Sequence, residues 1–235
     1  ADDTAVVGYQ RRGGHAVRVL DGVEGDAPLL YDLYCGGGGS TKGFQMAGFR
    51  VIGIDIVPQK HYCGDGFIQM DALEFVAKYI DGEFERASAI AASPPCQAFT
   101  KARRIHGNQH IDLLTPTRTA LIKTGLPWVI ENVPGAPMRA DMVLCGSQFG
   151  LGTENGGLIR HRWFEFCQPV LGLVGPCQHP KQCISVFGHG GHVYHGVADW
   201  KAAMGIDWMT RDELAQAIPP VFTKFIGTQL RQLML

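Results

Sequence analysis

The chain has 235 residues, of which 46% are hydrophobic, and its formal net charge is −1. This length and composition fit one α/β domain with a small lobe, and no apolar run is long enough to predict a membrane span. The first residues lack the charged-then-apolar pattern of a signal peptide. The near-zero charge excludes a generally basic nucleic-acid binder, so contacts with nucleic acid would depend on local patches.

Short apolar runs alternate with helical patterns along the first two thirds of the chain. Strands are predicted at residues 29–33, 51–55, 87–92 and 128–131, and helices at residues 72–80 and 116–123. A further helix is expected to be capped by Ser40 or Thr41 and to end at Gly48. This alternation predicts a Rossmann-like α/β fold, a mainly parallel sheet with helices on both faces. Ligands bind such sheets at the carboxyl ends of the strands.

The pattern weakens beyond residue 167, where glycine and histidine are frequent, and helix returns from residue 210 with a break at Pro219-Pro220. We therefore divide the chain into an N-terminal extension (1–27), a main domain (28–166), a small lobe (167–200) and C-terminal helices (201–235).

The seven cysteines are an odd number without a paired framework, which favours free thiols in a reducing cytoplasm. A zinc site is an alternative at the side chains that could ligate it: Cys167, Cys177, His179, Cys183, His189, His192 and His195. Their spacings do not fit the usual two-residue knuckle, so we expect no metal.

The glycine run at residues 36–39 follows a strand and precedes a helix, where glycine lets the backbone approach a ligand closely. Taken alone, the run also fits an ordinary tight turn. Asp55 ends the next strand, 23 residues after Asp32, and an acid there typically accepts hydrogen bonds from ribose hydroxyls. Asp71 follows a third short strand and is placed to accept from an adenine amino group. These acids together favour a nucleotide-like cofactor.

Cys96 ends the turn Ser93-Pro94-Pro95-Cys96 after a predicted strand, where a thiol can meet substrate and act as a nucleophile. The alternative is an inert buried thiol, which the two prolines disfavour because they indicate a loop. Glu131 ends an apolar strand, where a carboxylate is costly unless it is paired or functional. A raised pKa would let Glu131 donate a proton.

Two short basic patches could contact nucleic acid, Lys101-Ala102-Arg103-Arg104 and Arg160-His161-Arg162. On a strand, Arg160 and Arg162 would share a face and offer bidentate donors to a base or phosphate. Solvated surface charge is the alternative for the first patch.

In their order along residues 29–235, these motifs resemble those of the cytosine-5 DNA methyltransferase family. The matching segments are Asp32-Leu33-Tyr34-Cys35-Gly36-Gly37-Gly38, Pro94-Pro95-Cys96-Gln97, Glu131-Asn132-Val133, Arg160-His161-Arg162, Ala203-Met204-Gly205-Ile206-Asp207-Trp208 and Ala217-Ile218-Pro219-Pro220. In this family the final helix returns to pack beside the cofactor loop.

The resemblance implies transfer of a methyl group from S-adenosylmethionine to carbon 5 of a cytosine flipped out of duplex DNA. The implied cofactor-binding residues are Asp32, Tyr34, Gly36, Gly38, Asp55, Ile56, Asp71 and Pro94. The implied catalytic residues are Cys96, Glu131, Arg160 and Arg162. We expect a monomer in the cytoplasm of a prokaryotic or phage-infected cell, serving restriction-modification or phage DNA modification.

The chain departs from the family pattern in three side chains: Asp55 replaces a glutamate, Leu158 a glutamine and Gln216 an asparagine. Only about 40 residues separate Arg162 from Gly205, where the family usually carries a long target-recognition segment. A short or relaxed target of about two to four base pairs is therefore expected.

Other functions remain open. An RNA (tRNA) cytosine-5 methyltransferase and a non-catalytic DNA-binding relative are the alternatives. A zinc deaminase is disfavoured because the chain has no His-x-Glu and no Cys-x-x-Cys.

Overall fold

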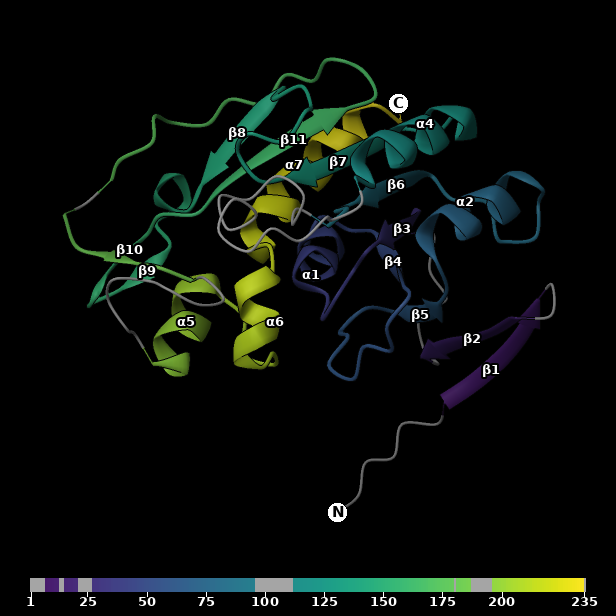
Figure 1. The fold of residues 1–235 in the computed structure, drawn as a ribbon, viewed down its shortest axis with the longest axis horizontal. Helices are drawn as coiled ribbons and strands as arrows, with labels where there is room; N and C mark the ends of the chain where they lie inside the picture. The colour runs from purple at the N-terminus through teal and green to yellow at the C-terminus, as the bar shows by residue number, and fades with distance from the viewer. Residues whose placement is uncertain are drawn as a thin grey trace.

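The computed structural model describes residues 7–12, 15–20, 27–95, 112–179, 181–186 and 196–234. Within these residues, nine strands form one sheet in the order β1-β2-β5-β4-β3-β6-β7-β11-β8 (Figure 1). Its strands are β1 (Val7–Arg12), β2 (His15–Leu20), β3 (Leu29–Leu33), β4 (Arg50–Asp55), β5 (Gly66–Gln69), β6 (Ala89–Ala92), β7 (Trp128–Asn132), β8 (Met142–Cys145) and β11 (His161–Phe166). The five central strands, from β5 to β7, are parallel, whereas β2 and β11 run against their neighbours.

Helices cover both faces of the sheet, as the sequence predicts. Helices α1 (Gly39–Met46) and α7 (Pro220–Gln232) pack on one face, together with Leu30 and Val51. Helices α2 (Ala72–Ile80) and α4 (Leu114–Thr124) pack on the other, together with Tyr31 and Ile52. Successive strand residues point to opposite faces, so strands buried on both sides are mostly apolar along their whole length. This arrangement explains the continuous apolar runs in the sequence.

Strand β3 and helix α2 have the bounds that the sequence predicts, but α1 begins differently. Its N-cap is Gly38, in a left-handed conformation with φ of 86° and no side-chain cap. The hydroxyls of Ser40 and Thr41 donate instead to the buried Asp32 carboxylate. The prediction that one of them caps the helix was wrong, because a buried carboxylate needs their donors more than the helix end does.

A lobe beside the main sheet is built from β9 (Gly152–Thr153), β10 (Gly156–Leu158), β12 (Cys183–Ile184), α5 (Val197–Met204) and α6 (Arg211–Gln216). Figure 1 shows α5 next to β9 and β10 and α6 beside α5, far from β1 and β2. Leu158, Ile184 and Trp200 belong to its separate core. The predicted lobe boundary at residue 200 falls inside α5, and the predicted start at 167 omits β9 and β10. The reason is that apolar side chains from α5 and α6 pack onto these short strands.

The described part of the N-terminal extension continues the main sheet. Strands β1 and β2 form an antiparallel pair, and β2 joins β5 through Arg18 opposite Phe67 and Val19 opposite Gly66. At the other end, α7 lies on α1, where the Thr223 hydroxyl donates to the Ser40 carbonyl at 2.8 Å. Among the residues described, no helix is both long and apolar enough to cross a membrane.

Candidate active site

The predicted site residues meet at the carboxyl edge of the parallel strands. Asp32 lies in β3, Asp55 ends β4, Pro94 follows β6 and Glu131 lies near the end of β7. These strands are neighbours in the sheet, in the order β4-β3-β6-β7. Four motifs that are far apart in sequence therefore share one edge, where open α/β sheets bind ligands.

Asp32 is an acid without exposed surface. Its Oδ2 accepts hydrogen bonds from Ser40 at 2.7 Å and Thr41 at 2.6 Å. Its Oδ1 is buried without a hydrogen-bond partner in the described part of the chain. Burial raises the pKa of Asp32 to about 6, although the Thr41 and Ser40 hydroxyls oppose this shift. The oxygen without a donor is a feature that a cationic or hydrogen-bonding ligand would satisfy.

Asp55 shapes the loop in which a cofactor is predicted. Its Oδ2 accepts from the Gly36 N–H at 3.0 Å, and its Oδ1 accepts from the Val57 N–H at 2.9 Å. Beyond Asp55, the Ile56 side chain is 65% exposed, an unusual position for a large apolar group at a strand end. Among the described residues other than its chain neighbours, none has an atom within 4 Å of where a Gly36 Cβ would lie. Open space, an anchored loop and an uncovered apolar side chain fit a nucleoside.

The other predicted cofactor residues have structural partners as well. Tyr34 is a non-glycine residue with a φ of 60°, and its hydroxyl lies 2.8 Å from Thr117 Oγ1 in α4. Gly38 lies too close to Cys63 for a side chain, since a Cβ there would be 2.9 Å from Cys63 Sγ. Asp71 caps α2 by accepting from two backbone N–H groups through Oδ1. Asp71 Oδ2 takes part in neither of these bonds.

Glu131 and Arg162 form the charged centre of the site. Glu131 is 9% exposed, and its Oε1 lies 2.8 Å from Arg162 Nε. Burial raises the pKa of Glu131, while Arg162, Arg160 and a hydrogen bond from Ser93 act in the opposite direction. Within the described residues Oε1 has this charge contact but no aligned hydrogen-bond donor. The Glu131 carboxyl group is thus held by the charge of Arg162, and its Oε1 can still accept a hydrogen bond from a ligand.

Asn132, which follows Glu131, links the acid to the proline turn. Its Nδ2 donates to the Pro94 carbonyl at 2.9 Å, and its Oδ1 accepts from the Val133 N–H at 2.9 Å. The turn leads to Cys96, which lies outside the described residues, as does the basic patch at 101–104. Sequence reasoning did not assign this role to Asn132, although its place beside Glu131 in the same motif was a signal.

Arg160 occupies a different position from the one predicted. It is 4% exposed and donates to the backbone carbonyls of Val186, Ala215 and Ala217 at 2.7, 2.9 and 2.7 Å. These bonds join β11 to the lobe and to the segment before α7. Its guanidinium is therefore used in holding the fold, whereas Arg162 faces Glu131. The two arginines do not form one exposed patch.

Trp208 makes a contact with the glycine loop that, like the contact of Asn132 with Pro94, the sequence analysis did not predict. Its Nε1 donates to the Gly37 carbonyl at 2.9 Å, and the neighbouring Met209 packs within 3.0 Å of where a Gly37 Cβ would lie. The segment between α5 and α6 therefore closes over the glycine loop.

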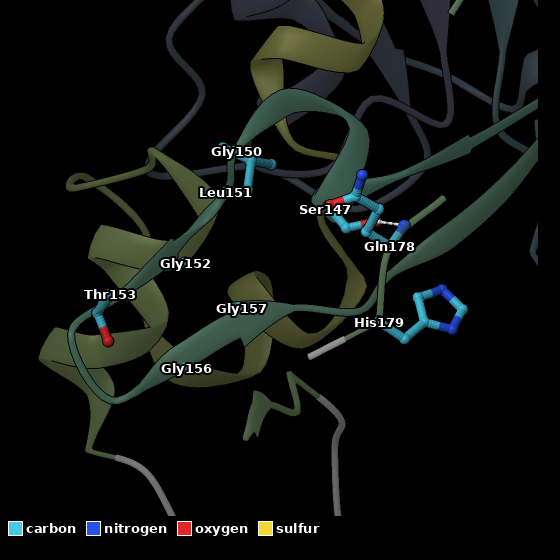
Figure 2. Close-up of a pocket in the computed structure, with 9 residues that line it drawn as sticks. All are labelled: Ser147, Gly150, Leu151, Gly152, Thr153, Gly156, Gly157, Gln178 and His179. Carbon is cyan, nitrogen blue, oxygen red and sulfur yellow. Dashed lines mark hydrogen bonds between the residues drawn. The ribbon is translucent and has the colours of Figure 1, made fainter. Parts of the chain in front are cut away.

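A pocket of about 650 Å³ lies away from this edge, in the lobe. Figure 2 shows it between the glycines of β9 and β10 and the segment carrying Gln178 and His179. None of the predicted site residues within the described part of the chain lines it. The pocket therefore adds no group to the chemistry described above.

Comparison with known proteins begins with sequence. No family model matches the chain. "Putative type II methyltransferase M.MJ0563P" from Methanocaldococcus jannaschii is 32% identical over 127 residues, which are 45% of this chain and 41% of that protein. The chain thus spans less than half the length of the curated relative it matches.

Solved structures extend the comparison to the fold. The Dnmt2 methyltransferase of S. pombe is 13% identical with a TM-score of 0.54, and the match covers 88% of this chain and 99% of that one. The methyltransferase EhMeth of Entamoeba histolytica is 11% identical with a TM-score of 0.57, covering 90% and 100%. The chain has the fold of these methyltransferases. The predicted Rossmann-like fold is confirmed.

Proposed function

We propose that this chain is an S-adenosylmethionine-dependent methyltransferase that modifies carbon 5 of cytosine in DNA. The observation that carries the proposal is the buried pair of Glu131 and Arg162, tied through Asn132 to the turn that precedes Cys96. An acid, a cation and a thiol are the groups that covalent attack on a pyrimidine ring requires, and Cys96 would supply the thiol. The fold and the curated relative support methyl transfer in general.

The glycine loop and its surroundings suit the cofactor. Asp55 would accept from the ribose hydroxyls, Ile56 and Tyr34 would flank the adenine, and Asp32 would face the amino acid part. Bound there, S-adenosylmethionine supplies a methyl carbon on a positively charged sulfur, an electrophile for an electron-rich carbon. Trp208, bonded to the Gly37 carbonyl, helps to close the loop and exclude water.

Cytosine carbon 5 is a weak nucleophile because its electrons belong to an aromatic ring. In our proposal the Cys96 thiolate forms a bond to carbon 6 while Glu131 donates a proton to ring nitrogen N3. Carbon 5 then has enamine character and would take the methyl group from the sulfonium sulfur, so that the S–CH3 bond breaks and S-adenosylhomocysteine is released. A base removes the carbon 5 proton, the bond from Cys96 to carbon 6 breaks to give back the thiolate, the N3 proton returns to Glu131, and aromaticity returns. The target must leave the duplex for these groups to reach it.

Glu131 suits the proton-donating role because burial raises its pKa. A carboxyl group with a raised pKa remains partly protonated nearer neutral pH, which improves proton donation. Arg162 opposes this shift and would also bind the base oxygen. Arg160 acts as a positioning residue, since its guanidinium is bonded to the backbone carbonyls of Val186, Ala215 and Ala217.

A direct assay tests this function. The full chain is incubated with radiolabelled S-adenosylmethionine and either duplex DNA or tRNA, and the nucleosides are separated. Label in 5-methylcytosine from DNA is expected. Label from tRNA alone would support the RNA alternative, and cofactor binding without transfer would support a non-catalytic relative. Label on an exocyclic nitrogen would contradict attack by carbon 5.

A mechanism-based trap tests the nucleophile. DNA containing 5-fluorocytosine should form a covalent adduct, because fluorine cannot leave as a proton does. Cys96→Ala should abolish the adduct and turnover. Cys167→Ser, a matched control that packs against the core away from the proline turn, should retain both. An adduct that survives Cys96→Ala would identify another nucleophile.

The small lobe bears on target length. Each good bidentate contact to a base supplies about 1–3 kcal/mol of discrimination, and a small lobe presents few of them. We propose a target of about two to four base pairs. Mapping of modified cytosines in DNA from cells that express the chain measures this length directly. A strict six-base consensus, against the few base contacts argued here, would contradict this part of the proposal.

A further inference from the structure

Four potential metal ligands gather where the lobe meets the main sheet. Cys145 ends β8, His161 begins β11, and Cys177 and His179 lie in the irregular segment after β11. One ligand atom from each lies within 4.8 Å of all the others. The sequence analysis considered Cys177 and His179 and set zinc aside because the spacings did not fit a two-residue knuckle. It did not include Cys145 and His161, which complete this group.

Two of the ligands come from a rigid base. His161 and Cys145 are directly opposite each other on the antiparallel strands β11 and β8. Residues paired in this way project to the same face of a sheet, with Cβ atoms about 4.5–5.5 Å apart. This cross-strand pair has no characteristic spacing in sequence, which is why a motif search does not find it.

The measured separations approach those of a tetrahedral site. Zinc bonds of about 2.3 Å to sulfur and 2.0–2.1 Å to nitrogen place tetrahedral ligand atoms roughly 3.3–3.8 Å apart. Cys145 Sγ lies 3.7 Å from His179 Nε2, and Cys177 Sγ lies 3.3 Å from His161 Nε2. Cys177 Sγ lies 2.6 Å from His179 Nε2, so this pair would have to move apart on binding the ion.

The Ser147 hydroxyl, which is not one of the four ligands, lies within hydrogen-bonding distance of both cysteine sulfurs. Ser147 Oγ lies 3.4 Å from Cys145 Sγ and 3.4 Å from Cys177 Sγ. It also accepts from the Gln178 N–H at 3.1 Å, the bond drawn in Figure 2. Hydrogen bonds to ligand atoms from surrounding residues are typical of metal sites, where they orient the ligands.

We propose that Cys145, His161, Cys177 and His179 bind one structural Zn²⁺ ion. Two thiolates and two imidazoles form a four-ligand set that zinc prefers, and four protein ligands leave no open position for catalysis. Thiols alone are weak hydrogen-bonding groups and would hold an irregular segment poorly. The ion would fasten the segment after β11 to the sheet and fix His161 between Arg160 and Arg162. The proposal is independent of the reaction assigned above.

Metal analysis tests the site without any activity assay. The full chain is expressed in zinc-supplemented medium, purified without chelator, dialysed, and its zinc content measured by mass spectrometry. About one zinc per chain is expected. Replacement by cobalt should give the strong visible bands of a tetrahedral site and the charge-transfer bands of thiolate ligation.

Variants locate the ion. Cys177→Ser and His179→Gln change exposed residues, so the fold should survive, and each should weaken zinc binding by more than about tenfold. Cys183→Ser, a matched control in the same lobe, should retain full zinc. Absence of zinc in the wild-type chain, a Cys145–Cys177 disulfide in its place, or equal loss in the Cys183→Ser control would overturn the proposal.

Discussion

Asn132 donates its side-chain amide to the Pro94 carbonyl at 2.9 Å, across 38 residues of sequence. Asn132 is 1% exposed, so this bond is sheltered from water. The end of β7 and the turn after β6 are thereby held in fixed relation. In the sequence, Glu131 directly precedes Asn132 and Cys96 follows Pro94 by two residues.

Asn132→Ala should impair chemistry more than cofactor binding. Loss of the amide leaves the Pro94 carbonyl without its donor, and misplacement by about 1 Å can lower a catalytic rate 10²-fold. We expect a fall of that order in the rate of adduct formation with 5-fluorocytosine DNA. The dissociation constant for S-adenosylmethionine, measured by calorimetry, should stay within about twofold. Parallel losses in both would assign Asn132 to folding alone.

Removing Arg162 should destabilise the protein in a pH-dependent way. Arg162→Met leaves a buried carboxylate unpaired, at a cost of about 3–5 kcal/mol. Arg162 lowers the pKa of Glu131, so its removal raises that pKa further. When the pKa of a carboxyl group is higher in the folded state than in the unfolded state, the protein loses stability as the pH rises through the folded-state pKa. The free energy of unfolding of the variant should therefore be lower at pH 8 than at pH 5.

The double variant Glu131→Gln/Arg162→Met provides the control for this pair. Urea unfolding of the wild type, both single variants and the double variant forms a double-mutant cycle. Residues in contact typically give a coupling energy of about 0.5–3 kcal/mol. Additive effects, without coupling, would show that the 2.8 Å contact between the two side chains contributes nothing to folding.

Asp32 should make the protein less stable as pH rises from about 4 to about 6. Its pKa is 3.8 when exposed and about 6 in the fold, so in this interval the folded state binds the extra proton. The difference between these pKa values corresponds to a contribution of up to about 3 kcal/mol to the free energy of unfolding. This contribution is fully present below pH 4 and is lost above pH 6. Asp32→Asn should remove this dependence. Unfolding curves recorded without cofactor at several pH values measure this dependence for the wild type and the variant. Identical pH profiles for the two proteins would contradict the role given to Asp32.

Asp55→Ala should weaken cofactor binding more than DNA binding. The change removes the predicted ribose acceptor and both bonds to the backbone of the loop. Each lost bond to a charged group is worth about 1.5–3 kcal/mol, so a loss of at least tenfold in affinity is expected. Calorimetry with S-adenosylmethionine and a gel-shift assay with DNA separate the two effects. Equal losses would remove Asp55 from the cofactor site.

The central strands β3, β4, β6 and β7 could be predicted from sequence because they are short, mostly apolar runs separated by helical patterns. The outer strands β1, β2, β8 and β11 were not predicted. Residues 29–33 and 72–80 illustrate this, since periodicity and burial agree there. The acids at strand ends could be predicted because a charge in an apolar run has few structural explanations. Periodicity carries no information on partners, however. The Cys145–His161 pair, the carbonyls around Arg160 and the Trp208–Gly37 bond all depend on which strands become neighbours.

The bond from Trp208 to the Gly37 carbonyl joins residues 171 positions apart. At about 5–20 residues per second, a ribosome makes Trp208 roughly 10–30 seconds after Gly37. During that interval Phe44 in α1 lacks its apolar cover from α7, which is made later still. The nascent chain therefore exposes an apolar surface until α7 has been made, and chaperones that bind such surfaces have time to act. The glycine loop acquires its bond to Trp208 only after residues 38–207 have been made.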